Sequence, residues 1–222
     1  MKRRELDSKC HELLLYFGLD GLDLKDASCI VFEQGEYVFC EGDPVQSLHL
    51  ILSGKAKIIL RSANGKQLLL SYFMSEGILG NLELMVEKAE YPLTVQAISE
   101  LICVVLPLSV YAREIKGNIR FLNHMARDLA KSLYKANRNA LALILQPLEA
   151  RLCAYITQTA VGGTFRETLT EVAELLGTSY RHLFRVFADL CEAGILQKGI
   201  SGYRIANQQV LDEKAGDLYT LR

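Results

Sequence analysis

Short apolar runs alternate with turn signals in the first half of the chain. Between about Ala27 and Pro107 such runs recur at residues 29–32, 37–39, 48–52, 56–60, 68–73, 93–98 and 102–106. Asn64-Gly65 is the strongest turn signal between them, because both residues tolerate the positive φ of a type I′ hairpin turn. Many short strands at regular spacing predict a small all-β barrel, roll or sandwich. A short helix over residues 5–17 is expected before it.

A long helical pattern follows the strands from about Leu108. Asn118 is expected to act as a helix cap, and beyond it apolar residues recur at alternating steps of three and four. They are Ile119, Leu122, Ala126, Leu129, Leu133, Ala136, Ala140 and Leu143. This 3.5-residue period is typical of a coiled-coil seam, so we expect a parallel partner helix and hence a homodimer. The alternative is that the seam packs on the chain's own barrel.

Gln146-Pro147 is expected to end this helix, because proline lacks a backbone N–H and clashes with the preceding turn. A new helix is expected over residues 148–159, closed by Gly162-Gly163. The predicted organisation is therefore a β-rich domain at residues 1–107, a helical connection at 108–146 and a C-terminal domain at 147–222.

Residues 168–190 have the pattern of a helix-turn-helix. Thr170 is expected to cap the first helix, Gly177 to make the sharp turn, and Ser179 to cap the second helix. An apolar stripe on the second helix leaves an outward face with Tyr180, Arg181, His182 and Arg185. Such a helix enters the major groove, where arginine can donate to guanine O6 and N7. The alternative is a plain helical hairpin with a solvated polar face.

Residues 195–205 predict two short strands around a glycine-rich turn, which would form a β-wing after the second helix. Lys198, Ser201 and Arg204 are expected to contact DNA phosphates from this hairpin. The alternative is that they are solvated loop residues.

Composition adds limits to this interpretation. Half of the 222 residues are hydrophobic and 23% are charged, which is enough apolar surface for a packed core. The formal net charge is -1, but DNA binding depends on where Lys and Arg lie rather than on total charge. No apolar run is long enough to span a membrane, and the basic N-terminus lacks the apolar segment of a signal peptide. A cytoplasmic protein without a membrane partner is expected, with most of its six cysteines as free thiols.

With these parts in order, the chain resembles the cyclic-AMP-receptor/fumarate-nitrate-reductase (CRP/FNR) superfamily of bacterial transcription regulators over nearly its whole length. The resemblance is carried by Gly35, Glu41-Gly42-Asp43, Gly54, Gly65, Gly77 and Gly80, and by Glu171-Val172-Ala173 through Arg185. The run from Gly177 to Leu183, with Gly202-Tyr203 after it, is similar to the YeiL branch. Tyr180 and Arg181 stand where many members have Arg and Glu, so a different target sequence is expected.

The resemblance implies an α+β fold: an N-terminal cupin-like β-roll (a double-stranded β-helix), a long dimerisation helix and a C-terminal winged helix-turn-helix. It implies a homodimeric transcription regulator that reads a pseudo-palindromic operator and senses a signal in its β-roll. The implied partners are double-stranded DNA, a second copy of the chain and RNA polymerase.

The same resemblance places an effector pocket around two segments of the β-rich domain. The residues are Gly80, Asn81, Leu82, Glu83, Tyr91 and Pro92. Cyclic-nucleotide members have a Gly-Glu-Leu run whose Glu holds the ribose and a later Arg-Ser whose Arg pairs with the phosphate. Here Asn81 lacks a carboxylate and Tyr91 lacks a positive charge. We therefore expect that cyclic AMP is not the effector, whose identity stays unknown.

The sequence favours buried, chemically inert cysteines over cysteines or histidines that bind a cofactor. An iron–sulfur cluster would draw on Cys10, Cys29, Cys40 and Cys103, whose spacing is not that of the cluster-binding members. A redox-active Cys29–Cys40 pair and haem ligation by His11, His49 or Cys10 are further alternatives. No metal site is expected.

Two other functional classes compete with a DNA-binding regulator. A regulatory module without DNA binding is an alternative, because the C-terminal domain has a balanced set of charges. An enzyme is not expected, because metal chemistry requires clustered His and carboxylates and His49 is the only histidine of the predicted barrel.

Overall fold

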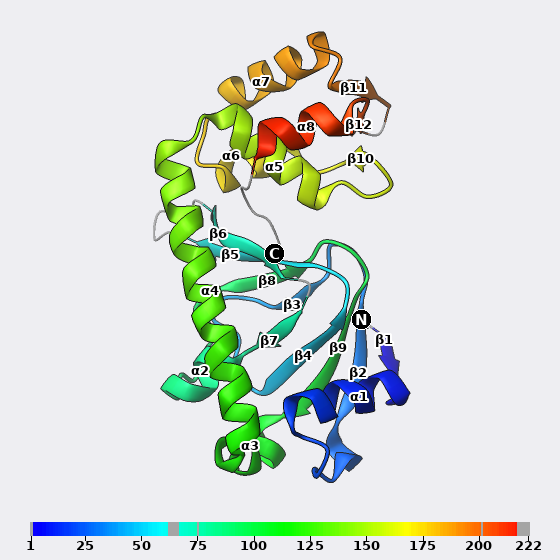
Figure 1. The fold of residues 1–222 in the computed structure, drawn as a ribbon, viewed down its shortest axis with the longest axis vertical. Coiled ribbons are helices and arrows are strands. Elements are labelled where there is room, and N and C mark those ends of the chain that lie inside the picture. The colour runs from blue at the N-terminus through cyan, green and yellow to red at the C-terminus, as the bar shows by residue number, and fades with distance from the viewer. Residues whose placement is uncertain (1, 62–66, 75, 201, 217–222) are drawn as a thin grey trace. The chain divides into compact units, whose positions relative to one another are not determined.

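The computed structural model describes residues 2–61, 67–74, 76–200 and 202–216, drawn in colour in Figure 1. The chain is a mixed α+β protein with an N-terminal β-sheet domain and a mainly helical C-terminal part. It divides into two compact units, one of residues 1–58 and 74–134 and the other of residues 59–73 and 135–222. The predicted Asn64-Gly65 turn lies outside the described residues.

Two sheets form the N-terminal domain. The first has the order β1 (Lys2–Arg4), β2 (Ser28–Phe32), β9 (Leu101–Pro107), β4 (Ser47–Ser53) and β7 (Gly77–Leu79), with antiparallel neighbours. The second has the order β3 (Tyr37–Phe39), β8 (Thr94–Ala97), β5 (Ala56–Arg61) and β6 (Gln67–Met74). Each of the predicted apolar runs forms a strand, which confirms the prediction of many short strands in this region.

Strand β7 was not predicted, because residues 77–79 are not among the apolar runs identified in the sequence. Gly77 has a φ of +109°, and a Cβ atom on it would come within 2.8 Å of the Asp128 carboxylate. The Asp128 carboxylate also accepts a hydrogen bond of 3.3 Å from the backbone N–H of Ile78. The positive φ at the start of β7 favours glycine, and the contact with Asp128 is one that a local sequence pattern does not reveal.

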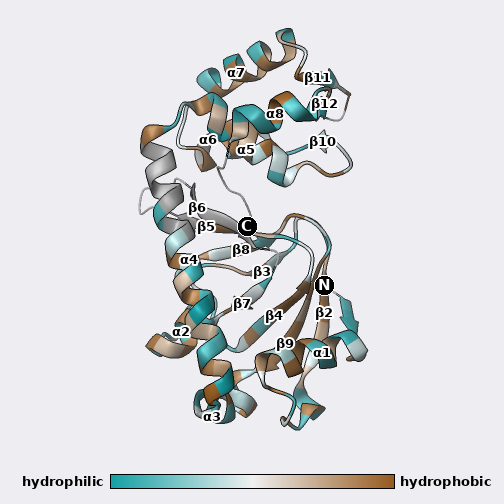
Figure 2. Ribbon diagram, viewed as in Figure 1, coloured by the Kyte–Doolittle hydropathy of each residue, from teal (hydrophilic) through white to brown (hydrophobic). Residues whose placement is uncertain are grey.

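A hydrophobic core lies on one face of the first sheet. Helix α1 (Ser8–Phe17) packs there through Cys10, Leu14 and Phe17, and α3 (Leu108–Gly117) through Tyr111 and Ile115. The central strands β2, β4 and β9 are rich in hydrophobic residues (Figure 2), as expected for strands covered by helices. Burying each Leu or Phe side chain contributes roughly 1.5–3 kcal/mol. A 3-10 turn at Leu24–Asp26 and a short helix α2 (Asn81–Val86) complete this domain.

The long helix α4 runs from Ile119 to Leu145. The Asn118 side chain accepts hydrogen bonds from the backbone N–H groups of Arg120 and Phe121, at 3.0 and 3.1 Å, which confirms the predicted cap. Phe121 and Met125 are buried in the core of the chain's own domain, and neither was predicted from the sequence.

The predicted seam of α4 lies beside that buried face. Ile119, Ala126 and Leu133 are exposed, whereas Leu122 and Leu129 are half-buried against the core. The side chains of Ala136, Ala140 and Leu143 lie outside the described ones. The seam stays a predicted dimer contact, and part of it also packs on the chain's own domain, as the alternative interpretation held.

The C-terminal part begins with α5 (Leu148–Thr159), directly after the predicted break at Pro147. It continues through β10 (Thr164–Phe165), α6 (Leu169–Leu175), α7 (Tyr180–Glu192), β11 (Leu196–Gly199), β12 (Gly202–Ile205) and α8 (Gln208–Ala215). The three strands form a sheet of order β10-β12-β11. Phe187 lies at the centre of the core, with ring centroids 5.7 Å from Phe165 and 4.4 Å from Tyr203.

One predicted cap of this part is wrong. Helix α6 begins at Leu169, and the N–H of Val172 bonds to the carbonyl of Thr168 at 3.1 Å. Thr170 therefore lies within the first turn and does not precede it, because the helix closes its first hydrogen bond earlier than predicted. None of the helices searched in the described part of the chain is both long and apolar enough to cross a membrane.

Candidate functional sites

A tight turn joins helices α6 and α7. Gly177 adopts a φ of +63° there, and the N–H of Thr178 bonds to the carbonyl of Ala173 at 2.9 Å. The Ser179 hydroxyl then accepts a hydrogen bond of 3.2 Å from the N–H of His182, so Ser179 is the cap of α7. The buried Ala173 is small enough for the two helices to approach each other. The sequence predicted both Gly177 and Ser179 correctly.

Helix α7 has one buried and one exposed face. The buried residues are Leu183, Val186, Phe187 and Leu190, as predicted. The exposed residues include Tyr180, Arg181, His182 and Arg185, so the structure brings these predicted residues together on one helix. Arg181 and Arg185 are both exposed to solvent.

Phe184 lies on the same exposed face and was missed by the sequence analysis. Its side chain is 43% exposed, and its ring stacks with that of Tyr180 at 6.1 Å between centroids and 19° between planes. The signal was present in the sequence, because position 184 follows the outward position 180 by four residues and so lies on the same helix face.

The hairpin of β11 and β12 follows α7. Lys198 is exposed and pairs in register with Tyr203. The guanidinium of Arg204 donates to the side-chain carbonyl of Gln197 at 3.1 Å, so it is partly used within the hairpin. Ser201 lies outside the described residues. Thr170 is exposed near the start of α6.

The predicted effector-pocket residues surround the start of α2. Gly80 has a φ of +85° and precedes the helix. Asn81 and Glu83 are buried, whereas Leu82 is 46% exposed. Burial raises the pKa of the Glu83 carboxyl.

Tyr91 lies next to Gly80: a Cβ atom on Gly80 would be 3.5 Å from the Tyr91 hydroxyl. Tyr91 is 3% exposed, and its hydroxyl donates a hydrogen bond of 2.9 Å to the backbone carbonyl of Ser47. Burial raises the pKa of Tyr91 to about 12, so the ring stays neutral. Pro92 is half-buried beside it. The structure thus brings the two predicted segments together, and Tyr91 uses its polar atom internally.

His49 is a buried polar residue of the same domain. It is 5% exposed, and its ring lies 6.0 Å from that of Phe39 and 6.4 Å from that of Phe32. Among the described residues, its Nδ1 atom has no hydrogen-bond partner. Burial lowers the pKa of His49 to about 4, so the imidazole is neutral at physiological pH.

The six cysteines are free thiols. Cys10, Cys29, Cys103 and Cys153 are buried, and the thiol of Cys10 lies beside that of Cys29. Burial raises the pKa of Cys10 and of Cys103 to about 12, so neither is a thiolate at neutral pH. Across the described residues, no three His, Cys, Asp or Glu side chains are grouped so that they could hold a metal ion. His11 is exposed on α1, whereas His49 is buried.

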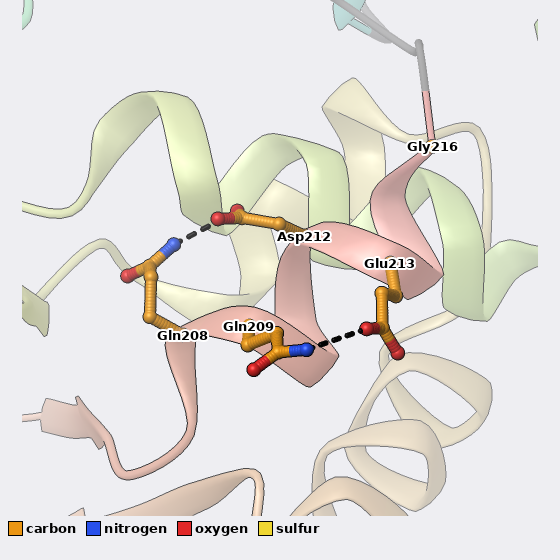
Figure 3. A pocket seen from close by; sticks show the side chains of 5 residues that line it. All are labelled: Gln208, Gln209, Asp212, Glu213 and Gly216. Atoms are coloured by element: carbon orange, nitrogen blue, oxygen red, sulfur yellow. Dashed lines mark hydrogen bonds between the residues drawn. The ribbon is translucent and has the colours of Figure 1, made fainter.

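A surface pocket lies on α8, lined by Gln208, Gln209, Asp212, Glu213 and Gly216 (Figure 3). Its polar groups pair along the helix: Gln208 donates to Asp212 at 2.8 Å and Gln209 to Glu213 at 3.0 Å. Two carboxylates make this surface unfavourable for a phosphate backbone, unlike the exposed face of α7.

Comparisons with known proteins identify relatives of this chain among bacterial regulators. The family described as "Cyclic nucleotide-binding domain" matches residues 29–118. The regulatory protein YeiL of Escherichia coli O157:H7 is 33% identical over 189 residues, which cover 84% of each chain. The CRP-like cAMP-activated global transcriptional regulator of Mycobacterium tuberculosis (strain CDC 1551 / Oshkosh) is 26% identical over 201 residues, 86% of this chain and 89% of that one.

A solved structure has a similar fold. The chain matches a CRP-family transcriptional regulator from Thermus thermophilus with a TM-score of 0.69 and 18% identity, over 87% of this chain and 100% of that chain.

Proposed function

The chain belongs to the CRP/FNR family of transcription regulators, and on that premise we propose that it binds double-stranded DNA as a homodimer and regulates transcription with RNA polymerase as a partner. Members of this family bind DNA and usually act as dimers. The observation that carries the proposal is the exposed face of α7, where Arg181 and Arg185 lie in the first two turns after the Ser179 cap.

In this proposal α6 and α7 are a helix-turn-helix, and β11 and β12 form its wing. The first turns of α7 enter the major groove, so that Tyr180, Arg181, His182 and Arg185 contact bases or phosphates. Arginine can donate two hydrogen bonds to guanine O6 and N7. Thr170, Ser179, Lys198 and Ser201 are proposed to contact phosphates, which position the domain without reading sequence.

Dimerisation is proposed to use α4. Its seam exposes Ile119 and Leu133, which are 69% and 64% exposed in the single chain. Large apolar side chains at this spacing are suited to a parallel partner helix. Two copies would then read a pseudo-palindromic operator with half-sites about one helical turn, or roughly 34 Å, apart.

The effector is proposed to act on the N-terminal domain beside α2, where Gly80, Asn81, Leu82, Glu83, Tyr91 and Pro92 lie. Cyclic AMP is not proposed as this effector, because the neutral, internally bonded Tyr91 stands where the phosphate would need a positive charge.

The test uses operator DNA enriched from genomic fragments by the full-length protein, in gel shifts at fixed salt. Arg185→Ala is expected to weaken binding to the enriched site by on the order of 1–3 kcal/mol. Arg113→Ala is the matched control, because it removes one exposed arginine from α3 instead. No enriched site, or equal affinity of the Arg185→Ala variant and the wild-type protein, would contradict the proposal.

A further inference from the structure

The exposed face of α7 is unusual because it contains an aromatic pair. Tyr180 is 51% and Phe184 43% exposed, and their rings stack at 6.1 Å. An exposed phenylalanine has no polar atom to hydrate, and a stacked aromatic pair forms a larger apolar surface than a single side chain. Clustered apolar surface of this kind indicates a binding site more often than a scattered apolar residue does.

The aromatic pair lies directly beside a cationic pair. Arg181 and Arg185 follow Tyr180 and Phe184 by one residue each, so the two pairs form adjacent rows, roughly 100° apart around the helix axis, along the first two turns of α7. The arginines favour a polyanion as the occupant of this face. A phenyl ring beside them can neither donate nor accept an ordinary hydrogen bond, so the group of a polyanion that suits it is an apolar one.

Resting on the proposed function, we propose that Phe184, supported by the Tyr180 ring, contacts the 5-methyl group of a thymine in each operator half-site. Thymine is the only standard DNA base with a methyl group in the major groove, and phenylalanine is among the side chains that contact it. Phe184 lies in the second turn of α7, close to the N-terminal residues that meet base edges in such motifs. Phe184 is therefore a specificity-determining residue, and the arginines supply attraction and guanine contacts.

The experiment replaces each thymine of the enriched operator in turn by deoxyuridine, which pairs with adenine identically but lacks the methyl group. Affinity of the full-length protein is measured by fluorescence anisotropy at fixed salt. At one position in each half-site, the substitution is expected to weaken wild-type binding about 4-fold, the equivalent of one buried methyl group. The Phe184→Ala variant is expected to bind thymine and deoxyuridine sites equally.

Two variants complete the design. Phe184→Leu is an intermediate case that keeps an apolar side chain, and it is expected to retain part of the deoxyuridine penalty even if the alanine variant does not fold. Leu15→Ala removes another exposed apolar side chain, on α1, and is expected to keep the full wild-type penalty.

The outcomes separate the two proposals. Absence of any specific site would contradict the proposed function itself. Specific binding in which no single deoxyuridine changes affinity more than about twofold would overturn only the role of Phe184, because a buried methyl group is worth more than that. A penalty that persists unchanged in Phe184→Ala would also overturn it, because another residue would then read the methyl group.

Discussion

The rings of Tyr91 and Phe39 stack face to face, with centroids 3.7 Å apart and planes within 8° of parallel. The Tyr91 hydroxyl also donates to the backbone carbonyl of Ser47 at 2.9 Å. Tyr91 is thus held at both ends inside the N-terminal domain, next to the Gly80 turn that begins α2. By the resemblance described above, Tyr91 stands at the sequence position where cyclic-nucleotide members have their phosphate-binding arginine.

Cyclic AMP is therefore expected not to bind. Its phosphate would be buried without a counter-charge, which costs several kcal/mol, roughly. Differential scanning fluorimetry and calorimetry with cyclic AMP are expected to show no change in melting temperature and no heat of binding. The Mycobacterium tuberculosis relative, named as cAMP-activated, is the positive control. Micromolar affinity for this chain would contradict the prediction.

His49 is expected to make the N-terminal domain sensitive to acid. Its pKa is about 4 when folded, against an ordinary value of 6.5, so the folded state resists protonation that the unfolded chain accepts. The contribution of this pKa shift to the free energy of unfolding, on the order of 3 kcal/mol, is fully present above pH 6.5 and is lost as the pH falls toward 4.

The measurement for His49 is urea unfolding of wild type and His49→Phe between about pH 7 and pH 4.5, the range in which an unfolded histidine gains its proton. The raised pKa of Glu83 acts in the opposite direction in acid, and comparing the two proteins removes its contribution. The variant is expected to lose less stability than wild type, because phenylalanine fits beside Phe32 and Phe39 without a proton to gain. A His11→Phe control, at an exposed position on α1, should follow wild type. If the free energy of unfolding depended on pH in the same way for all three proteins, His49 would not be the source of the acid sensitivity.

The Ser179 cap is expected to affect stability and DNA binding separately. Ser179→Ala leaves the His182 N–H without its side-chain acceptor and should destabilise the protein by about 1 kcal/mol. Ser179→Asp keeps a good cap but places a carboxylate near DNA phosphates. Thermal unfolding should therefore rank the aspartate variant near wild type, while gel shifts should show it to bind DNA more weakly. If the aspartate variant binds DNA as tightly as wild type, Ser179 does not face the phosphates.

Lys198 is expected to contact a phosphate and no base. Lys198→Ala should weaken binding to every DNA sequence similarly, and the slope of log affinity against log salt should fall by about two for a dimer, one for each protomer. Lys9→Ala removes an exposed lysine from α1 and should leave the slope unchanged. An equal slope for wild type and Lys198→Ala would place the hairpin away from the DNA backbone.

Leu133 is expected to lie in the dimer contact of α4. Leu133→Asp would bury two carboxylates against each other in a parallel pair, which is strongly unfavourable. Light scattering after gel filtration should show a shift from dimer to monomer for this variant. Leu15→Asp changes an exposed leucine on α1, 52% exposed, and should remain dimeric. A monomeric wild-type protein, or a dimeric Leu133→Asp variant, would contradict the proposed dimer contact along α4.

Local patterns in the sequence determined most of the elements of this protein. Alternating apolar runs predicted the strands from β2 to β9 except β7, and Pro147, Gly177 and Ser179 placed the breaks, turn and cap of the helices. These signals are reliable because strand period, proline sterics and capping act over a few neighbouring residues.

Tertiary structure decided what depends on residues far apart in the chain. Gly77 is favoured by its φ of +109° where the strand meets Asp128, and Tyr91 is held by Ser47 and Phe39, neither of which is near it in sequence. Only the folded chain shows that Phe121 and Met125 turn α4 toward its own domain, beside the predicted seam. Close approach, burial and the choice between two neighbouring helix faces arise from packing, so no periodicity within a single segment specifies them.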